Sequence, residues 1–397
     1  MSSRNRTLHL ASNSALAALA SLTASACIDD RAPIPTEAAP PPLVLSSPSL
    51  EGAMATAVWE DLGPARFAGR SMASAAEYAS AGPPELAQGA NAPAGDTVAI
   101  RVVDVHAGRE HRVRIDRAAL RAISARAQEL GLDRGSMPED AGPRPDAVVL
   151  EGWSNNHDSR ILRTNTTTYP YRAIGTLFDG GGDCTGTRIG PRLVLTAAHC
   201  IYNRDTASWN TINFKPGRNG TTSAPYGSSG AYRYWVPDEY IELGSGINGY
   251  DIGLIVLDTP VGNGWMGYGA WSGGFLDDQD LWMRGYPRCN TTGAPDGCQP
   301  KTLWGDTRTC ELGTFFDTDG DGWNRQIKTN CDGSAGQSGS SFYYYTSDGA
   351  PASIGVFSHH YCLAGCPDSQ HNAWPNVITR ITPTYLDVIN LYRAAFP

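Results

Sequence analysis

Residues 184–200 carry the sequence CTGTRIGPRLVLTAAHC. Within this stretch a strand-like run over residues 194–196 leads through two alanines to His199, which predicts an imidazole at a strand end beside closely packed backbone. Histidine suits general-base work because its ordinary pKa of about 6.5 lets it accept and return a proton near neutral pH. A lone histidine is usually structural. Here Cys184 and Cys200 can close a 16-residue loop beside it, and as a disulfide that loop would contribute roughly 3 kcal/mol of stability.

A second motif places an acid at the head of a strand. Residues 250–257 read YDIGLIVL, and the strand that follows Asp251 is too apolar to face water. A buried carboxylate needs a partner, and an imidazole N–H can supply one while it fixes the tautomer that leaves the other ring nitrogen free as a base. Taken alone, Asp251 could equally cap a turn at the strand edge.

A third motif, GQSGS at residues 336–340, places glycines on either side of Ser338. A serine hydroxyl is a poor nucleophile until a base removes its proton, and the oxyanion that forms needs hydrogen-bond donors already in place. The backbone N–H groups of Gly336 and Ser338 are the candidate donors. The pattern GxSxG also marks α/β-hydrolases, but their order is Ser, acid, His, whereas this chain has His, Asp, Ser.

The order His199, Asp251, Ser338, at intervals of 52 and 87 residues, fits two consecutive barrels. With these motifs the chain resembles trypsin-like serine proteases, and within them the bacterial glutamyl endopeptidase branch. The stretches that carry the resemblance are DSRILRTNTTTYPYRAIG, CTGTRIGPRLVLTAAHCIYN, YDIGLIVL, GYP at 285–287 and GQSGSS, all between about 155 and 395. It implies an all-β fold of two six-stranded antiparallel β-barrels with a C-terminal helix, here from Thr382. It also implies a monomeric serine endopeptidase that cleaves proteins or peptides through an acyl-enzyme.

The chain departs from these families at two positions near the proposed nucleophile. Ser341 stands where the branch has proline, which should not affect catalysis. Gln337 stands where trypsin-type activation uses an Asp to receive a new N-terminal amine. Arg160-Ile161 resembles an activation site, but its ion-pair partner is missing. We therefore expect another route of maturation, with a cut between residues 148 and 161.

The residue preferred before the cut bond stays open at this stage. The branch implies cleavage after Glu or Asp with the help of a histidine, but the matching position is Phe357, so His359 or His360 would have to substitute. Against this, Asp332 stands where trypsin-like enzymes that cut after Arg or Lys place an acid. The candidate pocket residues are Asp332, Ser334, Phe357, Ser358 and His359. We favour acidic specificity, with basic specificity as the alternative.

The N-terminus has the layout of an export signal. Two arginines precede a weakly apolar run over residues 8–24, which is too short and too interrupted to form a membrane span. The run ends in ASAC at Cys27 and resembles a lipoprotein signal, in which Cys27 would be lipidated and tether the protein to a membrane. Cleavage after Ala26 is the alternative. We expect an extracytoplasmic protein, secreted or lipid-anchored at the cell envelope, in which the other eight cysteines can form disulfides.

Four segments follow from these patterns: an export signal at 1–27, a Pro/Ala-rich tether and pro-region at 28–95, a small ββα pro-region at 96–155, and the protease domain at 156–397. In the third, two short strands form a hairpin, and Asp116 caps a helix with apolar residues at helical spacing. We expect this pro-region to be inhibitory or a folding aid. An independent binding role is the alternative.

Composition and charge bear on the fold class and on the partners that the protein can bind. The chain is 41% apolar and only 18% charged, with 44 glycines and 27 prolines, which suits a protein of strands and turns. The net charge of −9 and the lack of a basic stripe argue against a nucleic-acid partner. Asp317, Asp319 and Asp321 resemble the first half of a calcium loop, but Lys328 occupies the twelfth position. A solvated acidic loop is the favoured interpretation and a structural calcium ion the alternative; no cofactor is required for the expected chemistry.

Overall fold

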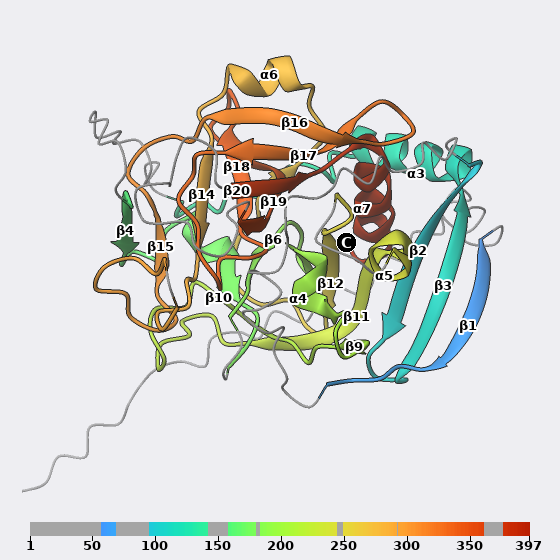
Figure 1. Ribbon diagram of the computed structural model, residues 1–397, viewed down its shortest axis with the longest axis horizontal. Coiled ribbons are helices and arrows are strands. Elements are labelled where there is room, and N and C mark those ends of the chain that lie inside the picture. The colour runs from blue at the N-terminus through green and yellow to red at the C-terminus, as the bar shows by residue number, and fades with distance from the viewer. Residues whose placement is uncertain are drawn as a thin grey trace, which may run out of the picture. The chain divides into compact units, whose positions relative to one another are not determined.

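The computed structural model describes residues 57–68, 95–141, 158–179, 183–243, 249–291, 293–360 and 376–397 (Figure 1). All of them belong to one unit, residues 42–397. The expected export signal with Cys27, most of the tether, and residues 148–157 of the expected processing region lie outside the described residues. Among the described residues, no helix combines the length and the apolar character needed to cross a membrane.

The first barrel closes on itself. Within the described residues its strands are β5 (Ile174–Thr176), β6 (Thr185–Arg188), β7 (Leu193–Thr196), β10 (Asn213–Pro216), β11 (Ser229–Pro237) and β12 (Gly253–Leu257). They pair in the order β11-β10-β5-β6-β7-β12, and β12 pairs again with β11. Leu193 to Thr196 and Gly253 to Leu257 are completely or almost completely buried, because each strand lines the apolar interior of the barrel.

A second barrel follows in the chain. Its described strands are β14 (Trp282–Gly285), β16 (Leu312–Thr318), β17 (Asn324–Thr329), β18 (Ser341–Tyr345), β19 (Pro351–His360) and β20 (Asn376–Arg380), in the order β16-β17-β20-β19-β18-β14. A bridge between Leu281 and Cys310 joins the two ends of this path. Three further strands attach to it: β13 (Gly267–Tyr268) pairs with β19, β15 (Leu303–Asp306) with β14, and β4 (Arg160–Arg163) with β15. The expected architecture of two six-stranded barrels is confirmed.

The ββα unit forms where the sequence predicts it, as β2 (Thr97–Asp104), β3 (Arg109–Asp116) and α3 (Arg117–Glu129). Asp116 caps the helix by accepting a hydrogen bond from the backbone N–H of Ala119 at 2.8 Å. A further strand, β1 (Val58–Pro64), pairs with β3. The unexpected feature is that β2 pairs with β11, so these three strands extend the sheet of the first barrel (Figure 1).

The C-terminal helix α7 (Pro383–Ala395) begins after its N-cap Thr382, as expected, and packs against α3 (Figure 1). A chain of buried polar contacts supports the packing: Tyr268 Oη donates to Asn390 Oδ1 at 2.8 Å, and Asn390 Nδ2 donates to Ser124 Oγ at 2.9 Å. The remaining described elements are η1 (Tyr171–Ala173), α4 (Ala198–Ile201), β8 (Tyr202–Asn203), β9 (Ser208–Trp209), α5 (Asp238–Glu242) and α6 (Gly273–Asp277).

A buried ion-pair network also ties the ββα unit to the first barrel. The guanidinium of Arg101 on β2, 7% exposed, contacts Glu110 at 2.6 Å and Asp238 of α5 at 2.8 Å. Arg112 on β3 reaches the same Asp238 at 2.8 Å and also pairs with Glu242. Removing one partner of such a buried pair leaves an uncompensated charge. The ββα unit is therefore held by sheet pairing, helix packing and charge together.

Candidate active site

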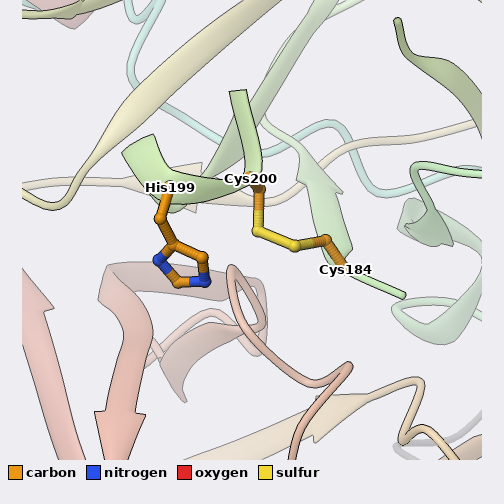
Figure 2. A group of neighbouring side chains, drawn as sticks. All are labelled: Cys184, His199 and Cys200. Atoms are coloured by element: carbon orange, nitrogen blue, oxygen red, sulfur yellow. A yellow bond between two sulfur atoms is a disulfide. The ribbon is translucent and has the colours of Figure 1, made fainter. Parts of the chain in front are cut away.

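His199 lies on the short helix α4, directly after β7. Its Nδ1 atom is 2.8 Å from Asp251 Oδ2, and its backbone N–H donates to Asp251 Oδ1 at 2.9 Å. Cys200, the next residue, is bonded to Cys184 as expected. Figure 2 shows that the imidazole and the disulfide leave the same helical turn in different directions. The disulfide thus holds the turn while the ring stays directed toward the acid.

Asp251 is completely buried at the start of the strand segment that becomes β12. Burial alone would raise the pKa of this carboxyl group, but the neighbouring His199 and three hydrogen bonds outweigh it, so the pKa lies below its ordinary value. Asp251 is therefore an ionised acceptor. Because it receives the Nδ1–H of His199, the Nε2 atom of the ring is left without a proton and can act as a base.

Ser358 and His359 lie behind Asp251. Ser358 Oγ is hydrogen-bonded to Asp251 Oδ2, and because the ionised acid has no proton to give, the hydroxyl donates. His359 Nδ1 lies 3.1 Å from Ser358 Oγ, so the imidazole must donate its own N–H to that oxygen. Burial lowers the pKa of His359 to about 4, which keeps the ring neutral. No sequence pattern links Ser358 to an acid 107 positions away. From the sequence, Ser358 and His359 were expected in the substrate pocket.

The loop that carries Ser338 presses against the strands that lead to His199. The backbone carbonyl of Ser338 accepts a hydrogen bond from the N–H of Thr185 on β6 at 2.8 Å. Gly339 has φ +81°, and a Cβ atom there would lie 2.0 Å from Thr196 Oγ1 at the end of β7. Only glycine allows this close approach. The loop of Ser338 thus lies at the end of β7, close in the chain to His199.

Gly336 sits on a tight turn two residues before Ser338. Its φ is +93°, and a Cβ atom would lie 2.6 Å from the backbone N of Arg288 and 2.7 Å from the carbonyl O of Tyr286. Its carbonyl accepts from Thr185 Oγ1 at 3.1 Å, which directs that oxygen into the protein. The N–H groups of Gly336 and Ser338 are the candidate oxyanion donors, and this turn determines where they point.

Comparison with known proteins places the chain in a family. The family model described as Trypsin matches residues 161–389. The chain belongs to the trypsin family. A glutamyl endopeptidase of Bacillus licheniformis is 44% identical over 139 residues, which cover 34% of this chain and 42% of that protein. An extracellular metalloprotease of Bacillus subtilis is 29% identical over 210 residues, 51% of this chain and 61% of that protein. The chain thus spans about half the length of these curated relatives.

Two solved structures of proteases are also similar. One is a Glu endopeptidase in complex with MPD, with a TM-score of 0.45 and 25% identity, covering 60% of this chain and 98% of that chain. The other is the protease Anisep from Arthrobacter nicotinovorans, with a TM-score of 0.42 and 19% identity, covering 60% of this chain and 99% of that chain.

Asp332, the acid that would favour basic substrates in a trypsin-family pocket, is engaged by another residue. Its Oδ2 atom accepts from the backbone N–H of Ser159 at 2.7 Å and from Ser159 Oγ at 2.9 Å. Its backbone N–H donates to Asp306 Oδ2 at 3.1 Å. Burial, and next the neighbouring Asp332, raise the pKa of Asp306 well above its ordinary value. The Oδ2 atom of Asp332 is therefore already bonded to Ser159 within the protein.

The other expected pocket residues lie close to one another. The ring of Phe357 is fully buried, and its Cζ would lie 2.9 Å from a Cβ placed on Gly333, so it packs against the loop that precedes the nucleophile. It also makes an edge contact with the ring of His360. Ser334 is fully buried and its Oγ accepts a hydrogen bond from Arg160 Nη1 at 2.7 Å. Arg160 was expected only as a cleavage position, because nothing in its local sequence indicates burial.

The aspartates of the acidic loop that resembles a calcium site make contacts with other residues of the fold. Asp317 pairs with Arg325 at 2.7 Å, Asp319 accepts from the backbone N–H of Asp321 at 3.0 Å, and Asp321 pairs with Arg117 of α3 at 2.9 Å. In the described part of the chain, the groups whose ligand atoms converge are Cys184, His199 and Cys200, and Asp306, Cys310 and Cys331. The cysteines of both groups are in disulfides. The three aspartates therefore serve contacts within the fold, one of them to the ββα unit.

Proposed function

We propose that this protein is a serine endopeptidase that acts outside the cytoplasm and cuts after acidic residues. The observation that carries the reaction type is the pairing of His199 Nδ1 with the buried, ionised Asp251, on the strand end against which the Ser338 loop packs. This arrangement leaves a base, Nε2, facing away from the acid.

The reaction follows from these roles. Ser338 Oγ attacks the carbonyl carbon of the scissile bond while His199 Nε2 takes the hydroxyl proton, and Asp251 stabilises the imidazolium that forms. The N–H groups of Gly336 and Ser338 stabilise the oxyanion. His199 then returns the proton to the leaving amine, and an acyl-enzyme on Ser338 remains. A water molecule, deprotonated by the same base, releases the acyl group, and no step needs a cofactor.

Casein cleavage tests the endopeptidase assignment. The wild-type protein should release peptides from casein, and Ser338→Ala should release none above background. A protein that keeps the fold only for binding would leave casein intact at every pH tested. An esterase would hydrolyse small activated esters through Ser338 and leave casein intact. Either result would refute the endopeptidase proposal.

The contacts of Asp332 support acidic specificity. Asp332 is engaged by Ser159, so it is a poor partner for a cationic substrate side chain. The similarity to the glutamyl endopeptidase of Bacillus licheniformis points the same way. Because Phe357 stands in place of the expected histidine, His360, whose ring contacts Phe357, would have to supply the positive charge.

Mass spectrometry of peptides cut from a complex proteome tests the specificity directly. Acidic specificity predicts peptide ends after Glu and Asp, and the same preference in Asp332→Asn. If the ends follow Arg and Lys and this preference disappears in Asp332→Asn, then Asp332 receives the substrate and the acidic assignment is wrong.

Export is supported by the disulfides, which form in oxidising compartments. In the described residues the bonds are Cys184–Cys200, Cys289–Cys298 and Cys310–Cys331. We further propose that Cys27 is lipidated. Cells that express the wild-type protein should hold it in the membrane fraction and incorporate labelled fatty acid into it. Cys27→Ser should abolish both, and equal behaviour of the two proteins would contradict lipidation.

We propose that the ββα unit is a folding aid for the first barrel. It supplies Leu120 and Ile123 to the same apolar core as β7, β11 and α7, and it pairs its strand with β11. A chain without residues 57–141 should therefore fail to regain activity after dilution from urea, whereas the full chain should recover it. Equal recovery would contradict this role.

A further inference from the structure

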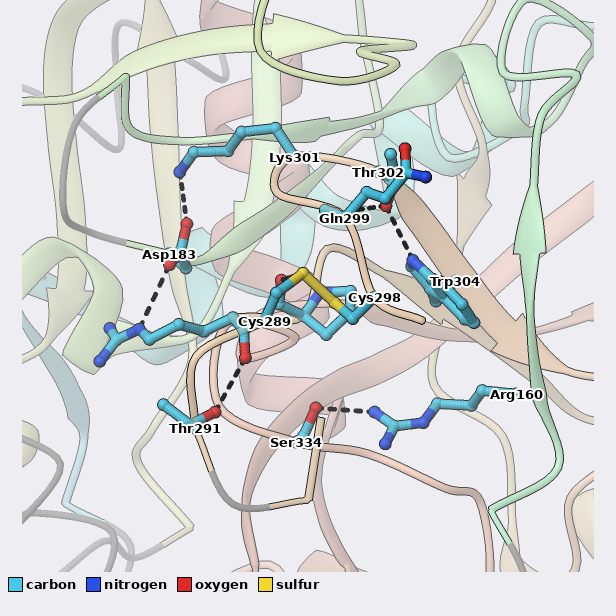
Figure 3. Close-up of a disulfide and its surroundings, with 12 residues drawn as sticks. Arg160, Asp183, Cys289, Thr291, Cys298, Gln299, Lys301, Thr302, Trp304 and Ser334 are labelled. Carbon is cyan, nitrogen blue, oxygen red and sulfur yellow. Dashed lines mark hydrogen bonds and ion pairs between the residues drawn. A yellow bond between two sulfur atoms is a disulfide. The ribbon is translucent and has the colours of Figure 1, made fainter. Parts of the chain in front are cut away.

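The guanidinium of Arg160 is buried among three segments of the chain. Its side chain is only 2% exposed, although it lies on the edge strand β4. Nη1 donates to Ser334 Oγ at 2.7 Å and also to Gln337 Oε1; Nη2 donates to the carbonyl of Gly293 at 2.6 Å. Figure 3 shows the side chain directed toward Ser334, near the disulfide of residues 289 and 298. Arg160 thus joins β4, the disulfide loop and the loop before the nucleophile.

Gln337 is the contact that links Arg160 to the nucleophile. Gln337 is fully buried and directly precedes Ser338. Its backbone N–H donates to the carbonyl of Ser334 at 3.0 Å, and its Oε1 accepts from the N–H of Ser334 at 3.1 Å. Because arginine has no acceptor atom, Oε1 and not Nε2 must face Arg160. The guanidinium therefore fixes the side chain that braces the turn from Ser334 to Gln337, and that turn orients the candidate oxyanion donors.

The charge of Arg160 is balanced from within the same segment. Asp158 accepts from Arg160 Nε at 2.9 Å and from its backbone N–H at 3.0 Å. A buried cation needs such a carboxylate, because the neutral amide of Gln337 supplies only a dipole. Residues 158–160 therefore bring both the cation and its counter-charge to the nucleophile loop.

Ile161, the residue after Arg160, lies on the outer side of β4, where its side chain is 43% exposed. Arg160 and Ile161 also lie in register opposite Asp306 and Gly305 of β15, so both belong to one continuous strand. Cleavage between them would release the guanidinium that the loop contacts.

We propose that Arg160 is the positioning residue that orders the nucleophile loop, in the role that a liberated N-terminal ammonium has in trypsin-type activation. The Arg160–Ile161 bond then stays intact in the active enzyme, and maturation cuts before Asp158. This inference rests on the proposed serine-endopeptidase activity, and it explains why glutamine can stand directly before the nucleophile.

The first experiment compares Arg160→Gln and Arg160→Lys with Arg163→Gln in the full chain. Arg163 is a matched control because it lies on the same strand. In the described residues its guanidinium donates to the carbonyl of Asp306 at 2.6 Å rather than to the nucleophile loop. Each variant is assayed for kcat and KM on a peptide, for the burst of acylation with an activated ester, and for its melting temperature. A burst in the wild type establishes the serine chemistry independently of Arg160.

Arg160→Gln should lower kcat by about 100-fold, the size of effect seen when one oxyanion donor is lost, with a smaller change in KM. Added guanidinium ion should restore part of the burst in Arg160→Gln, and Arg160→Lys should keep more activity than Arg160→Gln. Arg163→Gln should stay within about threefold of the wild type, because the turn before Ser338 is untouched. A kcat for Arg160→Gln within threefold of the wild type, while the wild type shows a full burst, would overturn the proposal.

A second measurement remains decisive if Arg160→Gln does not fold. The active wild-type enzyme is labelled at Ser338 with a serine-directed phosphonate, purified, and its N-terminal residue is identified. The proposal requires that the labelled enzyme begin at or before Asp158. An active enzyme that begins at Ile161 lacks Arg160 and overturns the proposal outright.

Discussion

Replacing His359 with asparagine should change how the stability of this protein depends on pH. The imidazole is 7% exposed, and burial lowers its pKa to about 4 from an ordinary 6.5. Asp251 opposes this by favouring the charged ring, whereas His360 and His199 add to it. Between these two pKa values the unfolded chain binds a proton more readily than the folded one. The contribution of His359 to the free energy of unfolding is therefore complete above pH 6.5 and is lost as the pH falls toward 4.

The magnitude follows from the two pKa values. The interval from 6.5 to about 4, at about 1.4 kcal/mol for each pH unit, corresponds to a maximum of about 3 kcal/mol, of which about 2 kcal/mol is already lost at pH 5. Asparagine at position 359 keeps an N–H donor for Ser358 Oγ but does not titrate in this range. His359→Asn should therefore lose less stability than the wild type on acidification.

Urea unfolding at pH 8, 7, 6, 5 and 4 measures this directly, in a Ser338→Ala background that prevents self-digestion. His359→Asn starts less stable at pH 8 because the asparagine fills the site less completely. Its deficit should then shrink by about 2 kcal/mol between pH 7 and pH 5. Parallel curves for wild type and His359→Asn, with equal urea dependence, would refute a neutral buried imidazole.

Four further substitutions test the remaining contacts. Asp251→Asn should lower kcat by about 10⁴-fold with little change in KM, because the amide stabilises the wrong tautomer of the general base; steady-state kinetics on a peptide substrate will show it. Ser358→Ala removes a donor from a buried carboxylate and should reduce the free energy of unfolding by about 2 kcal/mol in urea titrations. Gly336→Ala should lower kcat by about 100-fold, because φ +93° and the backbone contact exclude a side chain; a near-normal acylation burst would contradict this. Arg101→Gln removes the cation that contacts Glu110 and one of the two that contact Asp238, and it should destabilise the fold by about 3 kcal/mol in the same urea assay.

The local sequence determined the elements and the chemical types at the site. An apolar run that ends at His199, an acid before an apolar strand and a serine between glycines each follow from short-range patterns, because strand periodicity and glycine turns depend on neighbouring residues. Their order along the chain was enough to predict two barrels. The helix caps Asp116 and Thr382 were likewise visible, since a cap contacts residues only three positions away.

Only the tertiary structure decided which long-range contacts those elements make. The pairing of Ser358 with Asp251, the engagement of Asp332 by Ser159 and the burial of the Arg160 guanidinium each join residues more than 100 positions apart. Sequence patterns carry no register between such segments, so the contact of Ser358 with the catalytic acid could not be predicted from the sequence. The stretch at 184–200, together with the motifs at Asp251 and Ser338 and their order, thus determined the fold and the reaction type. How the nucleophile loop is ordered depended on where one edge strand, β4, packs.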